Sequence, residues 1–409
     1  MAEKKNKRSA AVILPIPAAN GCRKSGEVIP AVVGFRKSIR NRIITALFLV
    51  MISGATLSSQ EAGDLRLVDW EPRRQLVVKE TVVMKPKFPV IDIHNHLRDI
   101  EKAEYYLEQM DKAGVWICIG LDGHSKDDLF REYITGLHQV SDERFQVYFS
   151  PDFSRIDEPG FGETESRKLE EAVMLGARGL KIFKNLGLTL KDKSGEIVSV
   201  DDPRIDPLWE KCGELGIPVM IHVSDPKAFF DPVDRYNERY EELWSRPHWS
   251  FHGGGFPTKD EILQQRNRVI ARHPNTIFIG AHMGNLPENL AVVGSWLDNY
   301  PNFYVDINAR ICELGRQPYT ARRFMIEYQD RILFGTDTPP DAGAYRVHYR
   351  FLETDDEYFD PNPAHRFTFT DNPGRFMIYG LYLPDEVLEK IYNMNALKIF
   401  GMFKGVQDQ

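Results

Sequence analysis

The sequence predicts a TIM-like (β/α)8 barrel that forms a single catalytic domain. A chain of 409 residues with 42% apolar content can bury a large core. From Phe88 onward, short apolar runs alternate with longer segments of helical spacing, which is the pattern of βα units and a parallel sheet. There are eight such runs, and eight βα units favour a closed barrel, whose chemistry lies at the carboxyl ends of the strands.

The eight predicted strands are spread over residues 89 to 335. They are Pro89–Ile93, Val115–Ile119, Phe145–Phe149, Gly179–Phe183, Pro218–Ile221, Thr276–Ala281, Phe303–Ile307 and Arg331–Gly335. Predicted helices between them include Lys102–Ala113, Glu163–Leu175 and Pro207–Leu215, and Gly216 suits the end of the last one. The connection after the fifth run, Val223–Asn275, is long and rich in aromatic residues, as loops that select substrates often are.

The amino-terminal segment has the order basic, apolar, small that is typical of a secretory signal peptide. Arg36 to Arg42 is basic, Ile43 to Ile52 is apolar, and residues 53–59 are mostly small. We therefore predict a signal peptide with an extended leader at 1–59, a connector at 60–86 and the metal-dependent barrel at 87–409. The expected location is periplasmic or secreted, and the alternative is an uncleaved membrane anchor.

Charge and cysteine content exclude several classes of protein. Residues 1–59 carry ten Lys or Arg and two Glu, a net of +8, so the rest of the chain carries −15 of the total of −7. An acidic body argues against nucleic acid as a partner. The four cysteines are far apart and predict neither a disulfide framework nor a cysteine-rich zinc module.

Histidines and an aspartate follow the predicted strands. His94 and His96 end the first run with two-residue spacing, so both side chains face the same side. His222, His282 and Asp337 follow the fifth, sixth and eighth runs. A lone buried histidine is usually a packed core residue, but several at one barrel rim favour a metal site.

A set of three histidines and one carboxylate can leave a position open for water on a divalent ion. We expect one such ion, with zinc as first choice and manganese or iron as alternatives. An ion of this kind lowers the pKa of bound water and yields a hydroxide nucleophile. Asp337 could also take the proton from that water, and His282 could polarise a substrate carbonyl.

These residues resemble the amidohydrolase superfamily, and within it the amidohydrolase-related branch, over Phe88 to Phe403. The branch includes 2-amino-3-carboxymuconate semialdehyde decarboxylase, aromatic acid decarboxylases and lactonases. The resemblance implies His94, His96 and His222 as metal ligands, Asp337 as ligand or proton acceptor, and His282 as the catalytic histidine. It also implies a small-molecule substrate and a homodimer, because barrel enzymes of this branch are often dimers.

Four further residues are candidates for substrate binding. Lys181 lies in the fourth run, where two-metal relatives place a bridging carboxylated lysine, but it can equally be a free substrate-facing residue. Arg310 could clamp a carboxylate or form a surface ion pair. Trp249 and His252, in the long loop, could cover a ligand or only anchor the loop.

Three functions fit this pattern. The first is a hydrolase in which metal-bound hydroxide attacks an ester, lactone or amide-like bond of a small molecule. The second is a non-oxidative, metal-dependent decarboxylase of an unsaturated or aromatic acid. The third is a barrel that only binds a ligand, which a complete ligand set together with His282 makes the least favoured.

Overall fold

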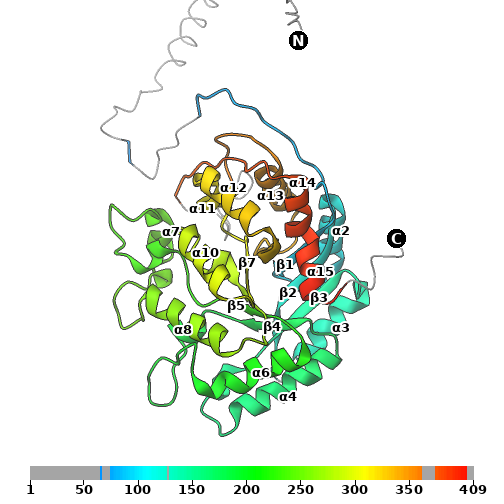
Figure 1. The fold of residues 1–409 in the computed structure, drawn as a ribbon, viewed down its shortest axis with the longest axis vertical. Coiled ribbons are helices and arrows are strands. Elements are labelled where there is room, and N and C mark those ends of the chain that lie inside the picture. The colour runs from blue at the N-terminus through cyan, green and yellow to red at the C-terminus, as the bar shows by residue number, and fades with distance from the viewer. Residues whose placement is uncertain (1–64, 67–73, 127–128, 362–373, 403–409) are drawn as a thin grey trace, which may run out of the picture. The chain divides into compact units, whose positions relative to one another are not determined.

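The computed structural model describes residues 65–66, 74–126, 129–361 and 374–402 (Figure 1). The described residues from Leu76 onward form one compact unit. The predicted signal peptide at 1–59 lies outside the described residues. Within the described ranges, no helix combines the length and the apolar character that crossing a membrane requires.

Eight parallel strands lie side by side in chain order, as the sequence predicts. They are β1 (Val90–Asn95), β2 (Val115–His124), β3 (Phe145–Ser150), β4 (Gly179–Ile182), β5 (Val219–Ile221), β6 (Phe278–Gly280), β7 (Phe303–Asp306) and β8 (Ile332–Leu333). Backbone hydrogen bonds from Ile93 to the Phe334 carbonyl (3.1 Å) and from Asp337 to the His94 carbonyl (2.8 Å) join β1 to the segment of β8. These bonds bring the two edges of the sheet together into a near-closed barrel.

Helices follow the strands, and the three helices predicted by range are confirmed within a few residues. The longer ones are α2 (Ala103–Ala113), α3 (Leu129–Ser141), α4 (Phe161–Met174), α6 (Asp206–Leu215), α8 (Lys259–Arg272), α10 (Leu290–Asn299), α12 (Pro318–Glu327) and α13 (Ala342–Glu353). Gly216 ends α6 in the left-handed conformation, with φ of 66°. Short helices α5 (Asn185–Leu188), α7 (Tyr240–Ser245), α9 (Ala281–Gly284) and α11 (Ile311–Arg316) lie in the loops after β4 to β7.

The apolar residues form two interior clusters. One fills the space between the strands and the surrounding helices. The other fills the barrel, and side chains from the last helix, α15 (Asn395–Ile399), join it, whereas those of the preceding α14 (Asp385–Glu389) belong to the first cluster. Asn395 donates to the carbonyls of Gln329 and Ile332, just before and at the start of β8 (both 2.7 Å). The carboxyl-terminal segment therefore covers the amino-terminal end of the barrel and leaves the other end for the site.

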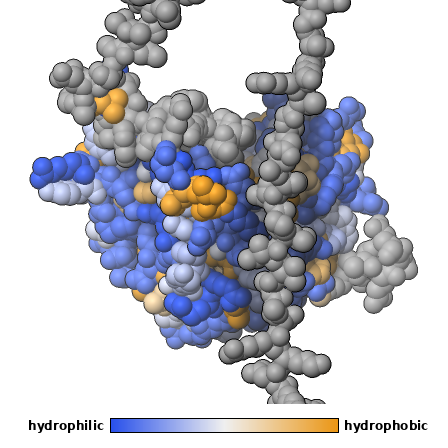
Figure 2. All heavy atoms as spheres, turned by 90° about the horizontal axis from the view of Figure 1, so that it is seen from above, coloured by the Kyte–Doolittle hydropathy of each residue, from blue (hydrophilic) through white to orange (hydrophobic). Residues whose placement is uncertain are grey.

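The predicted connector contains neither helix nor strand in its described part, and from Leu76 on it belongs to the barrel unit. The Thr81 backbone N–H and hydroxyl both donate to Asp356, at 2.6 and 2.7 Å. The face of the molecule in Figure 2 is largely hydrophilic, with hydrophobic side chains in small separate patches. Such scattered patches are ordinary for a protein surface.

Candidate metal and substrate site

The first functional side chain is His94, at the carboxyl end of β1. Its ring is buried, and Nδ1 lies 2.8 Å from Asp306 Oδ2 and 2.6 Å from the Asn308 amide. Asp306 is the last residue of β7. Because the carboxylate occupies Nδ1, the Nε2 atom is left to face Asp337, whose Oδ1 is 3.1 Å away.

His96 lies two residues further on and has the same kind of support. Its Nδ1 is 2.9 Å from Oδ1 of Asp122, a residue near the carboxyl end of β2. Its Nε2 is 3.2 Å from Asp337 Oδ1. Burial opposes the charged form of His96, but the hydrogen bonds to Asp122 and Asp337 outweigh it and raise its pKa to about 9. The two histidines of the HxH motif therefore converge on one carboxylate oxygen, as their spacing predicts.

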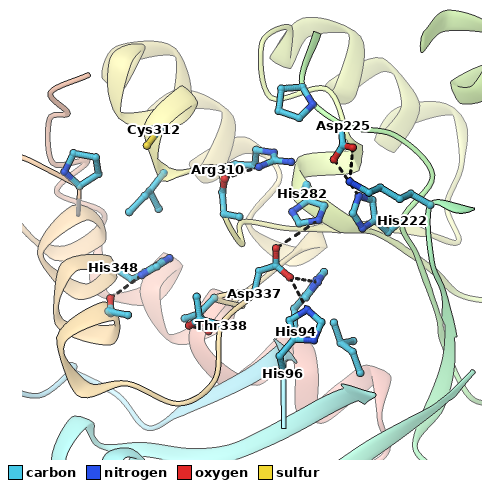
Figure 3. Close-up of a pocket in the computed structure, with 18 of the residues that line it drawn as sticks. His94, His96, His222, Asp225, His282, Arg310, Cys312, Asp337, Thr338 and His348 are labelled. Atoms are coloured by element: carbon cyan, nitrogen blue, oxygen red, sulfur yellow. Dashed lines mark hydrogen bonds and ion pairs between the residues drawn. The ribbon is translucent and has the colours of Figure 1, made fainter. Parts of the chain in front are cut away.

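Asp337 follows β8 in a left-handed backbone conformation, with φ of 65°. The conformation is held by the hydrogen bond from its N–H to the His94 carbonyl. Burial raises the pKa of the carboxyl, but the neighbouring rings of His94 and His282 and the hydrogen bonds of both β1 histidines hold it well below its usual range. Asp337 is thus ionised at neutral pH and lies at the centre of the site (Figure 3).

His282 lies after β6, in α9. Its backbone N–H donates to Asp306 Oδ1 (2.7 Å), and its Nδ1 is 3.2 Å from the Asn308 carbonyl. Its Nε2 is 3.9 Å from Asp337 Oδ2. Burial lowers the pKa of His282 well below its usual range, and nearby Arg310 lowers it further, so the ring is neutral.

Three of these residues form the group that could hold a metal ion. The ligand atoms of His94, His282 and Asp337 all lie within 4.8 Å of one another. The ligand set predicted from the sequence is different, and consists of His94, His96, His222 and Asp337. His96 contacts Asp337 of this group, as described above, whereas the His222 ring faces Ser224 and Asp225.

His222 follows β5 and lines the same cavity, with its ring centroid 4.3 Å from that of His282. Its Nε2 lies 3.1 Å from the Ser224 carbonyl and 3.7 Å from Asp225 Oδ1. Burial lowers the pKa of His222 to about 4, although the hydrogen bond to Asp225 opposes the shift. Figure 3 shows His222 beside Asp225, away from the His94 and Asp337 pair.

These groups line a cavity of about 410 Å³ at the carboxyl ends of the strands. Lys181, Arg310 and Trp249, three of the four predicted substrate-binding residues, line it. The fourth, His252, is not among its lining residues. The His252 ring is exposed and lies 3.2 Å from the Phe230 carbonyl, because the loop turns away after Phe251 through three glycines with positive φ.

Lys181 and Arg310 are both buried, and each has a nitrogen without a hydrogen-bond partner among the described residues, Nζ of Lys181 and Nε of Arg310. The Lys181 Nζ lies 5.0 Å from the centroid of the Phe183 ring. Trp249 stacks on Phe229, with 6.0 Å between ring centroids. The cavity thus combines aromatic walls with two basic side chains, each of which has a nitrogen that can still donate a hydrogen bond.

Sequence reasoning missed the acids behind the histidines. Asp306 is the last residue of β7 and Asp122 lies two residues before the end of β2, so their position near strand ends was a usable signal. It also missed His348 of α13, whose Nδ1 lies 2.8 Å from the Ala344 carbonyl while its buried Nε2 has no partner in the described part of the chain. Because a carbonyl only accepts, Nδ1 carries the proton and Nε2 is an acceptor at the cavity wall (Figure 3).

Several solved structures share a distant likeness with the chain. They include a 2,6-dihydroxybenzoate decarboxylase from Rhizobium, with 16% identity, 77% of this chain and 99% of that chain covered and a TM-score of 0.48. A dihydroxybenzoic acid decarboxylase from Polaromonas sp. JS666 with bound manganese has 17% identity, coverages of 77% and 98% and a TM-score of 0.49. An amidohydrolase from Burkholderia multivorans with bound zinc has 11% identity, coverages of 77% and 99% and a TM-score of 0.43. No curated protein sequence matches the chain.

A protein-family model also matches the sequence of this chain. The model described as Amidohydrolase matches residues 156–402, from before α4 to the end of α15. The HxH motif of β1 precedes the matched segment, so its place in the site rests on the geometry described above. The match spans more than half of the chain and includes His222, His282 and Asp337, so this chain belongs to the amidohydrolase family.

Proposed function

We propose that this protein is a metal-dependent hydrolase that cleaves an ester, lactone or amide-like bond of a small molecule. The observation that carries the proposal is the group formed by His94, His282 and Asp337, whose ligand atoms lie within 4.8 Å of one another at the carboxyl ends of the strands. Active sites of (β/α)8 barrels lie at this end. Membership of the amidohydrolase family supports the same reading.

The residues fit a divalent metal ion. Two imidazoles and one ionised carboxylate are ligands that zinc, manganese and iron accept. The contact of His94 Nδ1 with Asp306 orients the ring and leaves Nε2 for the ion, which is the usual support of a metal-binding histidine. An ion held there would lower the pKa of a bound water and polarise a substrate carbonyl.

Asp337 is suited to accept the proton of the attacking water, because its neighbours keep it ionised at neutral pH. His282 is buried and neutral, and its Nδ1 faces the Asn308 carbonyl, which only accepts, so Nε2 is left as the atom that would bind the ion. His96, with a pKa raised to about 9, carries a positive charge that offsets the negative charge of Asp337 when no ion is bound.

The cavity favours a substrate with an apolar body and an anionic group. Phe183 and Trp249 offer aromatic surface, and Lys181 and Arg310 each have an unpartnered nitrogen. A buried cation is stabilised by a carboxylate that bonds to it. The same feature favours the second candidate, a decarboxylase, because a carboxylic acid would then be the reacting group.

One experiment separates the two candidates. The full chain is loaded with Zn²⁺ or Mn²⁺ and incubated with lactones, esters, amides and carboxylic acids in ¹⁸O-labelled water. Hydrolysis puts ¹⁸O into the product and stops on chelation, whereas decarboxylation releases carbon dioxide and puts no label into the organic product. Asp337→Asn should abolish turnover, and Asp385→Asn, at an exposed position far from the cavity, should not.

Label uptake that survives both chelation and Asp337→Asn would refute the metal site. Carbon dioxide release without label would reject the hydrolase and leave the lyase. Absence of turnover across the panel, together with absence of metal binding, would reject both.

A further inference from the structure

The residues that carry His282 form a turn of left-handed helix. His282, Met283, Gly284 and Asn285 have φ values of 57°, 56°, 62° and 59°. For residues other than glycine, this conformation costs about 1–2 kcal/mol each, because Cβ approaches the following carbonyl oxygen. A run of four is therefore not a local preference of the chain and must be held by groups outside it.

Three groups outside the turn hold it. Asp306 accepts the His282 N–H, as described for the site. The second group is the backbone of Val223 and Ser224, because the Asn285 side chain donates to the Ser224 carbonyl (2.8 Å) and accepts from the Val223 N–H (3.3 Å). The third is Arg266 of α8, whose Nη1 donates to the Gly284 carbonyl at 2.5 Å.

Arg266 is unusual because its charge is fully buried without an acidic partner. Its exposed fraction is 0%, and none of the ion pairs found among the described residues includes it. Its other hydrogen bonds go to the amide oxygen of Asn267, and its guanidinium lies over the rings of Trp296 (4.4 Å) and Phe303 (5.0 Å). Burial lowers the pKa of Arg266 to about 9.

A buried cation without a counter-charge destabilises the fold, so its presence calls for a use other than stability. The only bond that Arg266 makes outside its own helix, among the described residues, is the one to Gly284. Gly284 lies against both aromatic and cationic neighbours, since a Cβ there would be in van der Waals contact with Arg266 Nη1 (3.6 Å) and Phe303 (3.5 Å), and its φ of 62° favours glycine. The turn and the guanidinium are thus packed as one unit.

We infer that Arg266 is a positioning residue that holds the left-handed turn in place and thereby aims His282 at Asp337 and at the metal site. The inference rests on the proposed metal site, since it assigns Arg266 a role through one of its ligands. Removal of the guanidinium should therefore lower the affinity for zinc, and this loss should be larger than the loss of folding stability alone would cause.

Arg331 provides a matched control. It too donates to backbone carbonyls, those of Leu297, Tyr300 and Phe303, and its guanidinium lies 4.9 Å from the Tyr304 ring centroid. It precedes β8, at the amino-terminal end of the barrel, and does not line the cavity. Arg331→Met therefore removes a guanidinium group with the same kinds of contact and leaves the contacts of the left-handed turn unchanged.

The test is a titration of the tag-free full chain with Zn²⁺ by calorimetry, with the urea midpoint measured for every variant. Arg266→Met should raise the zinc dissociation constant about tenfold or more, the usual effect of removing support from a metal ligand. Arg331→Met should lower the urea midpoint and leave zinc affinity unchanged. Arg266→Lys should lie between wild type and Arg266→Met, because an ammonium group reaches the carbonyl but does not stack.

A double mutant shows whether Arg266 acts through His282. In the His282→Ala background, Arg266→Met should cause no further loss of zinc affinity. If Arg266→Met does not fold, Arg266→Lys is compared with Arg331→Lys, and the loss should be confined to the former.

Zinc affinity that is equal in wild type and in the folded Arg266 variant overturns the inference and leaves the metal site standing. Additive losses in the double mutant also overturn it. Absence of zinc binding by the wild type rejects the proposed metal site, and the inference with it.

Discussion

Replacing Lys181 by methionine should stabilise the protein, although the residue lies in the middle of the candidate site. Lys181 is on β4 with an exposed fraction of 1%, and its Nζ has no hydrogen-bond partner among the described residues. Methionine keeps the length of the apolar stem and removes the ammonium group. The variant therefore isolates the free energy of burying that charge.

The magnitude follows from the pKa of the lysine. Burial lowers it from 10.5 to about 8, and the charges of Asp337, Asp306 and Asp122 only partly oppose this shift. The unfolded chain thus holds the proton more tightly than the folded chain. The difference of about 2.5 between the two pKa values corresponds to about 3 kcal/mol. This destabilisation is complete below about pH 8 and disappears as the pH rises towards 10.5.

The assay is urea unfolding of chelator-treated wild type and Lys181→Met at two pH values. The stability gained by the variant should fall from about 3 kcal/mol at pH 7 to about 1 kcal/mol at pH 10. Lys126→Met, at an exposed position, should change stability by less than about 0.5 kcal/mol. A gain that is absent at pH 7, or that is the same at both pH values, would refute the reasoning. A confirmed gain would mean that the charge is kept for a purpose other than folding, as the proposed anion-binding role requires.

Two further predictions concern the support of His94. Asp306→Asn should raise the zinc dissociation constant by about 10- to 100-fold with the fold retained, and an unchanged constant in calorimetry would remove Asp306 from the support of the site. Gly335→Ala should destabilise the protein by about 1–3 kcal/mol in urea unfolding, because the new Cβ would lie 2.7 Å from the Cβ of His94. Gly343→Ala, in α13, would meet only Oδ1 of the helix-capping Asp341, at 3.0 Å, and should destabilise the protein less than Gly335→Ala, so equal effects of the two substitutions would contradict the steric argument.

The strands were predictable because apolar runs and helical segments alternate so regularly along the chain. Each of the eight runs overlaps one strand of the barrel, and the order of the strands follows from the rule that successive βα units lie side by side. The closure of the barrel was not predictable in detail. β8 has only two residues, and the contact with β1 is made by the residues after it, such as Phe334 and Asp337, whose backbone leaves the strand conformation.

The site was predictable where a functional side chain lies at or just after the end of a strand, because the carboxyl ends of the strands meet at one rim of the barrel. His94, His96, His282 and Asp337 are of this kind. His222 also follows a strand, but its ring turns towards Asp225, and the sequence contains no sign of that neighbour's position. His252 lies in a long loop, where the path of the chain depends on distant contacts, and its placement away from the cavity could not be foreseen.

Asp306 explains why the site depends on the order of the barrel strands. Its Oδ2 contacts the ring of His94 on β1, and its Oδ1 accepts the backbone N–H of His282 after β6. One carboxylate on β7 therefore sets the orientation of one ligand and the backbone of another. Arg266 contacts the same turn from its other end, at Gly284. His282 is thus held between an anion and a cation, both buried, and its strained conformation is a consequence of the tertiary structure and not of the local sequence.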